Sequence, residues 1–333
     1  MPLVAASTVL PAIKTLSDCA DWSKTVEPFI PQLKTLPQEV AQHVTSLEEL
    51  KALYLATNPL VDRFWSLLPT FYNAHFALWA HLAGLPTQRL DNVLAFSTLW
   101  SIRLTYNYWR KGGYNIGSED YRWEIIKSKV PAPVFFVFNV TFISTIQSVL
   151  LFLVTTPTYV LLLSSYLSGQ GMGTADIFFS RLLIALVVTE WFADQQQWNY
   201  QTAKHQYLRT AVVPRNSNRA DLDRGFVTSG LWAYSRHPNF AAEQAIWVVL
   251  YQWACYDTEV YMNWTFAGAM SYLLLFQGST WLTELITAGK YPEYKDYQKQ
   301  VGKFLPNLLR GKYKPAAPSA QPKQNKKVDQ KKK

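Results

Sequence analysis

Long apolar stretches separated by short polar ones occupy the middle of this chain. The longest, Pro133–Leu163, runs for 31 residues without a charged side chain. It lacks the polar face at helical period that a surface helix of a soluble protein shows. Because about 20 apolar residues in a helix cross the ~30 Å hydrocarbon core of a bilayer, the pattern predicts membrane-spanning helices. The run is long enough for one tilted helix or for two segments broken near Pro157.

Further apolar stretches predict the remaining helices. They are Phe64–Leu85, Leu90–Trp109, Ile177–Trp198, Ala242–Tyr256 and Val260–Leu282. The last two are expected to form a helical hairpin. Together the stretches predict an all-α integral membrane bundle of about six or seven transmembrane helices. A soluble all-α protein is the alternative, and the uncharged run argues against it.

The two ends of the chain differ from the apolar middle. Residues 1–58, with several prolines among short amphipathic stretches, are expected to form a peripheral N-terminal region before a membrane domain over 59–310. From Arg310 to Lys333 there are nine Lys or Arg and one Asp, which accounts for +8 of the net charge of +9. Residues 311–333 are therefore expected to be a disordered basic tail. After membrane segments such a tail indicates anionic lipid on the cytosolic side, and not nucleic acid.

The residue types present exclude several kinds of site. Cys19 and Cys255 lie far apart, which argues against a disulfide framework and a Cys-based zinc site. The five histidines are scattered without metal-ligand spacing, so we expect no metal. The chain also lacks a Gly-x-Gly-x-x-Gly fingerprint after a strand and a Gly-x-Ser-x-Gly elbow.

Polar groups gather in the segment Gly225–Trp247, just before and within an apolar run. Those within eight residues of one another are Arg236, His237, Asn239 and Glu243. Such groups are costly at a membrane mouth unless they face a protein interior or a bound polar ligand. The segment therefore predicts a binding site. Arg224 lies 12 residues before Arg236, and two guanidiniums in one pocket would suit phosphate.

Two other segments carry polar or aromatic stripes. The first stripe lies in and just after Ile177–Trp198, where polar or aromatic residues recur at i, i+4, i+8 and i+11: Glu190, Asp194, Trp198 and Gln201. This spacing puts them on one helix face and predicts either a ligand-lining face or a structural interhelical network. Near the C-terminus Tyr291, Tyr294 and Tyr297 are three apart, with Glu284 upstream. This second stripe is typical of an interfacial aromatic belt or of a ligand-binding segment.

Several segments, which follow one another in the family's order across residues 58–310, resemble the steroid 5α-reductase family. They resemble more closely the poorly characterised membrane-protein branch grouped with it and with the sterol reductases. GLWAYSRHPNFAAE (Gly230–Glu243) is the most specific of them. The others are VDRFWSLLP (Val61–Pro69), TYNYWRKGGY (Thr105–Tyr114), SEDYRWE (Ser118–Glu124), ADQQQWNYQ (Ala193–Gln201) and KYPEYKDYQKQVGKFLP (Lys290–Pro306).

The resemblance implies a multi-pass enzyme of the endoplasmic reticulum membrane. By this likeness it binds NADPH between its C-terminal helices and reduces a carbon–carbon double bond in a sterol, enone or enoyl lipid. The cofactor would carry the hydride chemistry, while the protein supplies orientation and a proton source. The cofactor-binding candidates are Asp194, Gln201, Arg224, Arg236, His237, Asn239, Glu243, Glu284, Tyr291 and Tyr294.

The chain departs from the family pattern where the substrate carbonyl would bind. Arg103 matches, but Trp100 occupies the position of a family Tyr, and an indole cannot act as an acid at neutral pH. The catalytic candidates are therefore other groups, namely Asp62, Tyr106 and Glu119, with Tyr108, Asp120 and Tyr121 as further proton donors.

Two other functions remain open at this point. Isoprenylcysteine-type methyltransferases carry a similar Arg-His-Pro and use S-adenosylmethionine, although their paired glutamates correspond here to Thr283–Glu284. A non-enzymatic protein of the same fold that binds lipid or nucleotide is the third possibility, and the missing Tyr favours it.

Overall fold

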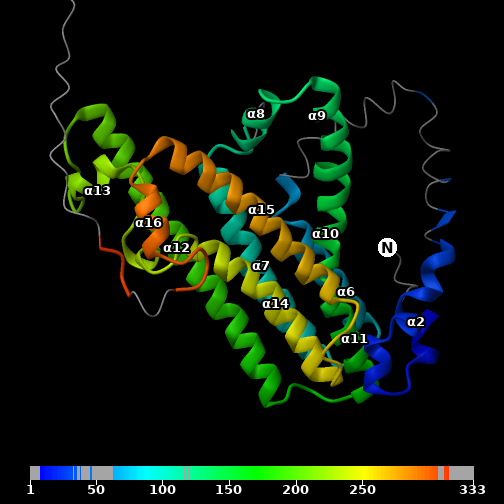
Figure 1. Cartoon of the computed structure of the whole chain (residues 1–333). Helices are drawn as coiled ribbons and strands as arrows, with labels where there is room; N and C mark the ends of the chain where they lie inside the picture. The colour runs from blue at the N-terminus through cyan, green and yellow to red at the C-terminus, as the bar shows by residue number, and fades with distance from the viewer. Residues whose placement is uncertain are drawn as a thin grey trace, which may run out of the picture. The chain divides into compact units, whose positions relative to one another are not determined.

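The computed structural model describes residues 8–32, 63–115, 121–306 and 311–314, together with 34, 35, 38, 46 and 118. Every regular element in these residues is a helix (Figure 1), which confirms the all-α prediction. Contacts divide the chain into two compact units. Unit 1 comprises the described parts of 1–192 and 239–281, and unit 2 those of 193–238 and 282–333.

Unit 1 begins with four short helical pieces, η1 (Leu10–Ala12), η2 (Leu16–Ala20), α2 (Trp22–Thr25) and η3 (Glu27–Phe29). Asp18 stabilises the start of η2 as the third helical residue of a capping box, because its carboxylate accepts the main-chain N–H groups of Lys14 and Thr15, each at 2.8 Å. Val9 and Cys19 are fully buried in the same core as the long helices. This part of the predicted peripheral region thus contributes to the core of unit 1.

Helices α6 (Leu68–Leu82) and α7 (Gln88–Arg110) pack against each other. Pro69 lies in the first turn of α6, where its missing N–H breaks no helical hydrogen bond. Gly84, just beyond the end of α6, has a φ of 68°, a conformation that favours glycine. Both helices lie where the apolar stretches predicted them.

The long uncharged run folds as a succession of helical pieces. They are α9 (Ala132–Phe138), the π-helical η4 (Asn139–Ile146), α10 (Gln147–Leu153) and α11 (Thr156–Ser168), preceded by α8 (Tyr121–Lys127). The helix is interrupted between Leu153, the end of α10, and Thr156, the start of α11. This agrees with the second sequence alternative, two segments broken near Pro157. Within the described residues, Ala132–Ser168 is the one helical run long and apolar enough to cross a membrane. The other predicted crossings stay predictions.

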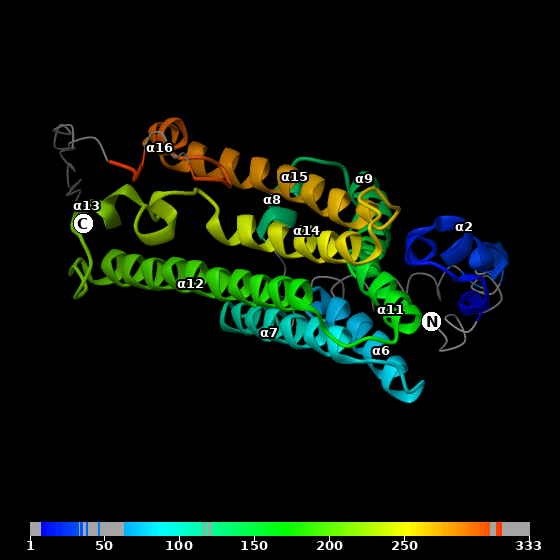
Figure 2. The same cartoon turned by 90° about the horizontal axis from the view of Figure 1, so that it is seen from below.

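Three long helices complete the described bundle: α12 (Thr174–Thr210), α14 (Pro238–Thr258) and α15 (Phe266–Lys290). The 37 residues of α12 span about 55 Å at 1.5 Å per residue, so its amide-rich C-terminal part extends well beyond the predicted crossing. In unit 1, α14 and α15 lie side by side in both views (Figures 1 and 2), as the predicted hairpin requires.

Large aromatic side chains fill the core of unit 1. Trp100, Trp247, Trp253 and Tyr272 are at most 1% exposed. The rings of Trp100 and Trp247 meet edge to face with centroids 5.3 Å apart, a preferred geometry for aromatic pairs. Each of these four residues also carries a polar N–H or O–H, which a buried position obliges to find a partner.

Unit 2 contains the C-terminal part of α12, α13 (Arg219–Arg224), η5 (Gly230–Ala233), the end of α15 and α16 (Tyr294–Gln300). Its small core consists of Phe226, Tyr294, Tyr297, Val301 and Tyr313. Tyr313, within the predicted tail, packs on Tyr297 with ring centroids 5.0 Å apart. Residues 315–333 of that tail lie outside the described residues.

Candidate functional site

Arg236 and His237 lie in the short non-helical segment of unit 2 between η5 and α14. The main-chain N–H of Arg236 donates to Gly302 at 2.9 Å, and that of His237 donates to Lys303 at 3.1 Å. These two bonds join the Arg-His-Pro motif to the chain after α16. Pro238 then begins α14, a position at which its missing N–H is harmless.

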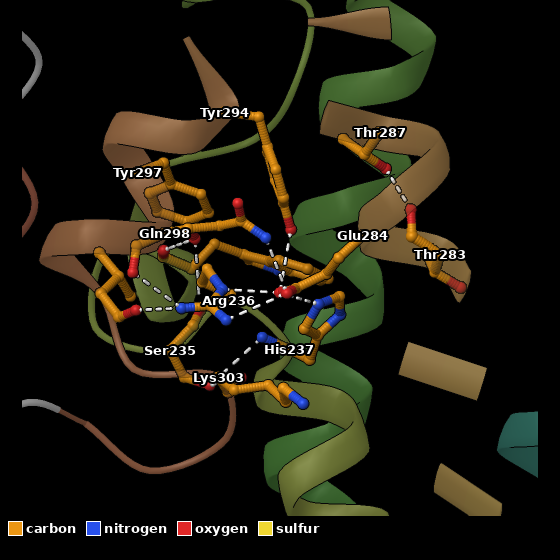
Figure 3. A network of polar contacts seen from close by, with 12 residues as sticks. Ser235, Arg236, His237, Thr283, Glu284, Thr287, Tyr294, Tyr297, Gln298 and Lys303 are labelled. Atoms are coloured by element: carbon orange, nitrogen blue, oxygen red, sulfur yellow. Dashed lines mark hydrogen bonds and ion pairs between the residues drawn. The ribbon is translucent and has the colours of Figure 1, made fainter. Parts of the chain in front are cut away.

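The Arg236 guanidinium binds Glu284 and the main chain at once (Figure 3). Nε donates to Glu284 Oε1 at 2.6 Å and Nη2 donates to Oε2 at 3.1 Å, a bidentate pair. Nη1 donates to the carbonyls of Gln298 at 3.1 Å and Val301 at 2.5 Å. The side chains of Arg236 and Glu284 are at most 10% exposed. The guanidinium of Arg236 thus makes four hydrogen bonds inside unit 2.

Glu284, on α15, has three further partners. His237 Nε2 lies 2.9 Å from Oε1, Tyr294 Oη donates to Oε1 at 3.3 Å, and Gln298 Nε2 donates to Oε2 at 2.9 Å. Burial raises the pKa of Glu284, but the bonds to His237 and Arg236 outweigh it and hold the pKa well below its usual range. Glu284 is therefore ionised at neutral pH.

Four of the predicted cofactor-binding residues therefore meet in one network, namely Arg236, His237, Glu284 and Tyr294. In this arrangement the guanidinium of Arg236 is neutralised by a carboxylate, so its direct role is to hold the motif to the C-terminal segment. Tyr294 and Tyr297 are buried at 5% and 1% exposure. They are core residues and not part of an interfacial belt.

Arg224, the second predicted guanidinium, has its own partners at the end of α13. Nη1 donates to Asp221 Oδ1 at 2.6 Å and to Thr228 Oγ1 at 2.9 Å. Nε is buried without a hydrogen bond in the described structure, 3.6 Å from Glu293 Oε2. Arg224 and Arg236 thus bind different carboxylates.

The polar stripe on α12 is divided between the two units. Asp194 and Gln201 are half-buried in unit 2, whereas Glu190 is fully buried in unit 1. The neighbouring amide of Gln196 accepts the main-chain N–H of Leu231 at 2.9 Å. This part of α12 therefore holds η5, a role that the sequence did not reveal.

Glu243 lies at the centre of a second buried network, in unit 1. Trp100 Nε1 donates to its two carboxylate oxygens at 2.8 and 3.0 Å. Trp247 Nε1 donates to Oε1 at 3.1 Å, and Tyr272 Oη donates to Oε1 at 2.7 Å. Trp100, in the position of the family Tyr, is therefore a partner of Glu243. Trp247 and Tyr272 were missed; only the i, i+4 spacing of Glu243 and Trp247 could have indicated one of them.

Arg103 supplies the positive charge of the Glu243 network. Nη2 donates to Glu243 Oε2 at 3.1 Å, and Nη1 lies 2.8 Å from Glu190 Oε1. All three side chains are at most 6% exposed. One guanidinium thus serves two carboxylates, and the network connects α7, α12, α14 and α15. Asn239 is half-buried at the start of α14.

The predicted catalytic residues are not brought together in the described structure. Tyr106 is 41% exposed; its ring stacks on Trp191 at 5.8 Å, and the Arg110 guanidinium lies 5.2 Å from its centroid. Tyr108 packs on Tyr114. Asp62, Glu119 and Asp120 lie outside the described residues. The assignment of the proton donor to one of these residues stays a prediction.

Lys204, on α12, is a polar residue of unit 2 that the sequence did not single out. Its ammonium is buried and donates to Tyr291 Oη at 2.7 Å and to the Gly225 carbonyl at 2.6 Å. Lys204 lies four residues after Tyr200, whose hydroxyl donates to the Asp221 carbonyl at 2.8 Å.

The fold and these networks define an all-helical protein with two buried, hydrogen-bonded glutamates and a helical run that could cross a membrane. The chain belongs to the family described as "Protein of unknown function (DUF1295)", which matches residues 52–301. It is similar to an uncharacterised protein, C594.04c, of Schizosaccharomyces pombe. The two are 35% identical over 334 residues, which cover 92% of this chain and 95% of the relative. No solved structure matches the chain.

Proposed function

We propose that this protein is a membrane-embedded, NADPH-dependent reductase of a carbon–carbon double bond in a sterol, enone or enoyl lipid. One observation carries the proposal. Arg236 and His237 meet Glu284 and Gln298 in a single network, although up to 62 residues separate them in sequence. These are the two segments to which the likeness to the 5α-reductases assigns the cofactor.

The charges of unit 2 are compatible with an anionic dinucleotide. NADPH supplies a hydride when bound, and its phosphates require cationic or N–H donors. All three nitrogens of the Arg236 guanidinium are bonded to Glu284 or to main-chain carbonyls, whereas Arg224 pairs with Asp221 through Nη1, so Arg224 is the better phosphate ligand. Its buried Nε makes no hydrogen bond to any described residue. Lys290, exposed beside Tyr291, is a second cation for this role.

Apolar side chains exposed along several helices of unit 1 support a membrane location and a lipid substrate. Scattered apolar residues are normal at a protein surface, but repeated ones along successive helices indicate lipid contact. Those more than half exposed include Phe71, Leu78 and Leu82 on α6, Ile102 and Trp109 on α7, Val134 and Val137 on α9, Phe178 and Phe192 on α12, and Leu274 and Trp281 on α15.

The charged residues inside the same helices are buried, which also supports a membrane location. Charged side chains within membrane helices face the protein interior and pair with one another. Arg103, Glu190 and Glu243 do so, since each is at most 5% exposed and they form one network. This distribution favours several crossings, even though hydropathy alone identifies one helical run. The proposed location is the endoplasmic reticulum membrane, with the basic C-terminal end in the cytosol.

The decisive experiment is thermal unfolding of the detergent-purified protein with NADPH, NADH, S-adenosylmethionine or no ligand. A ligand that binds only the folded state stabilises it by about 2.7 kcal/mol at a hundredfold excess over its dissociation constant. We expect a shift with NADPH, followed by NADPH oxidation in the presence of conjugated enone sterols or enoyl lipids. A shift with S-adenosylmethionine alone would assign methyl transfer instead. No shift with any of the three would indicate a non-enzymatic protein.

A pair of arginine variants sharpens this experiment. Arg224→Gln removes the proposed phosphate ligand and should reduce the NADPH shift. Arg219→Gln is the matched control, because Arg219 lies on the same helix but its side chain is 76% exposed. Equal NADPH shifts in the two variants would remove Arg224 from the proposed site.

A further inference from the structure

Lys204 is a buried cation without a carboxylate partner in the described structure. It is 8% exposed, and its two hydrogen bonds go to the phenol oxygen of Tyr291 and the carbonyl of Gly225. A buried ammonium is costly unless neighbouring groups stabilise its charge. The neighbour that can become an anion here is Tyr291. The contact therefore favours negative charge on the Tyr291 oxygen.

The backbone holds the Tyr291 ring against this ammonium. Gly225 has a φ of 88°, and a Cβ at this position would collide with the Tyr291 ring. The glycine thus both allows the turn after α13 and leaves room for the ring. Phe226 packs on Tyr291 with centroids 6.0 Å apart. The phenol is positioned, yet the residue remains partly exposed.

The electrostatic surroundings set Tyr291 apart from the other tyrosines of unit 2. Burial raises its pKa, but the hydrogen bond and charge of Lys204, with the charge of Lys290, outweigh it and lower the pKa. Burial instead raises the pKa of Tyr200 and Tyr294 above the ordinary value. The charged and titratable groups around Tyr291 are Lys204 and Tyr200 from α12 and Lys290 from the end of α15.

We propose that Tyr291 is the proton donor of the reduction and that Lys204 is its positioning residue. This inference rests on the proposed function and deepens it, because it names a proton donor for that reaction. Tyr106, the described residue among the three predicted catalytic ones, lies in unit 1. Tyr291, so far a cofactor-binding candidate, takes a chemical role. It combines partial accessibility with an adjacent ammonium that stabilises the phenolate.

The reaction balances with this pair. NADPH, when bound, would supply a hydride to the β-carbon, and the two π electrons of the double bond would move onto the α-carbon and carbonyl. The α-carbon takes the proton of Tyr291 Oη, and the phenolate left behind is stabilised by the Lys204 ammonium. Water then returns a proton to the phenolate. NADPH and one proton are consumed, and NADP⁺ and the saturated lipid are formed.

The first test needs no substrate. Ultraviolet difference titration of wild type against Tyr291→Phe should show one tyrosine that ionises at lower pH than the others. Lys204→Met should move that ionisation to higher pH, and Lys204→Arg should largely restore it. The proposal is overturned if the titration of Tyr291 does not respond to Lys204→Met in a folded protein.

The second test measures reduction by NADPH oxidation with enone sterols and enoyl lipids. Tyr291→Phe should lose ~100-fold or more of the rate, as removal of a general acid does, while the NADPH thermal shift persists. Lys204→Met should displace the pH profile. Tyr207→Phe is the matched control. Tyr207 lies on α12, the helix that carries Lys204, but its hydroxyl donates to Asp223 at 2.8 Å. The rate of this variant should equal that of wild type.

The outcomes separate the two proposals. Wild-type reduction that survives in Tyr291→Phe overturns the assignment of the proton donor and leaves the reductase in place. Absence of NADPH binding and reduction in the wild type overturns the proposed function, and the assignment with it. Loss of the thermal shift in Tyr291→Phe would make Tyr291 a cofactor ligand, which also contradicts the proton-donor role.

Discussion

Glu243 in unit 1 and Glu284 in unit 2 are both buried, and each binds an arginine, but their other partners differ in kind. Glu243 accepts from two indoles and a phenol, and its arginine, Arg103, also serves Glu190. Glu284 accepts from an imidazole, a phenol and an amide. Its arginine also binds two main-chain carbonyls.

This difference shows two ways of stabilising a buried carboxylate. Around Glu243 the donors are side chains on long helices, so the network fixes how those helices pack. Around Glu284 the guanidinium of Arg236 binds the main chain after α16, so the network fixes the path of an irregular segment. Irregular segments carry main-chain groups that no helix satisfies. An arginine with five donors can satisfy several of them at once.

Loss of Arg103 should have the largest effect. Arg103→Met would remove the cation that both Glu190 and Glu243 bind, and breaking a buried pair in this way costs about 3–5 kcal/mol. Chemical unfolding in detergent measures the change. Arg219→Met, with its 76% exposed side chain, is the control and should stay within about 0.5 kcal/mol of wild type. Equal stability of the two variants would show that the Glu243 network does not hold unit 1 together.

Loss of Arg236 should be somewhat milder, at about 2–4 kcal/mol, because His237, Tyr294 and Gln298 still donate to Glu284. The double variant Arg236→Met with Glu284→Met should be less destabilised than the sum of the two single changes, since it leaves no unpaired charge. Additive effects would mean that the ion pair is not the main interaction. Limited proteolysis should also show earlier cleavage after α16 in Arg236→Met.

The pH dependence of stability should distinguish Glu284 from ordinary surface carboxylates. Its folded pKa lies below the unfolded value of about 4.3. The stabilisation is therefore fully present above about pH 5 and is lost as the pH falls through and below the unfolded pKa. As the pH falls from about 6 to about 3, the thermal unfolding temperature should decrease more steeply in wild type than in Glu284→Gln. Parallel curves would contradict the strong pairing.

The smallest effect is expected from Trp100→Phe. The change removes one donor to Glu243, while Trp247, Tyr272 and Arg103 remain. The cost should be about 1 kcal/mol, the usual net value of one hydrogen bond. Trp191→Phe, a 41% exposed tryptophan of the same unit, should cost less. A loss as large as that of Arg103→Met would show that Trp100 organises the network.

Much of the helical architecture could be predicted from the sequence. The apolar stretches predicted α6, α7, α12, α14 and α15, and Pro157 indicated the interruption between α10 and α11. Length and hydropathy suffice for this because a helix satisfies its own main chain locally. They do not define the termini, since α12 continues to Thr210, twelve residues beyond the predicted end at Trp198.

The candidate site was predicted less completely. The motif residues Arg236, His237, Glu284 and Tyr294 do meet, but their bonding to one another was not evident. Trp247 and Tyr272 were missed, because apart from the i, i+4 spacing of Glu243 and Trp247 the sequence does not distinguish an aromatic core residue from a donor to a buried carboxylate. Lys204 was missed because its partners, Gly225 and Tyr291, are distant in sequence. Tyr106, predicted as a proton donor, is 41% exposed and its ring stacks on Trp191, contacts that leave the prediction untested.

The sequence by itself determined the helical class, the apolar segments and the motifs rich in polar side chains, since these follow from local composition and periodicity. The tertiary structure alone decided which charge each polar group meets. Arg236 pairs with a glutamate 48 positions away, and Trp100 with one 143 positions away. Pairings over such separations depend on how whole helices pack, and the desolvation of each carboxylate then decides which donors it must have.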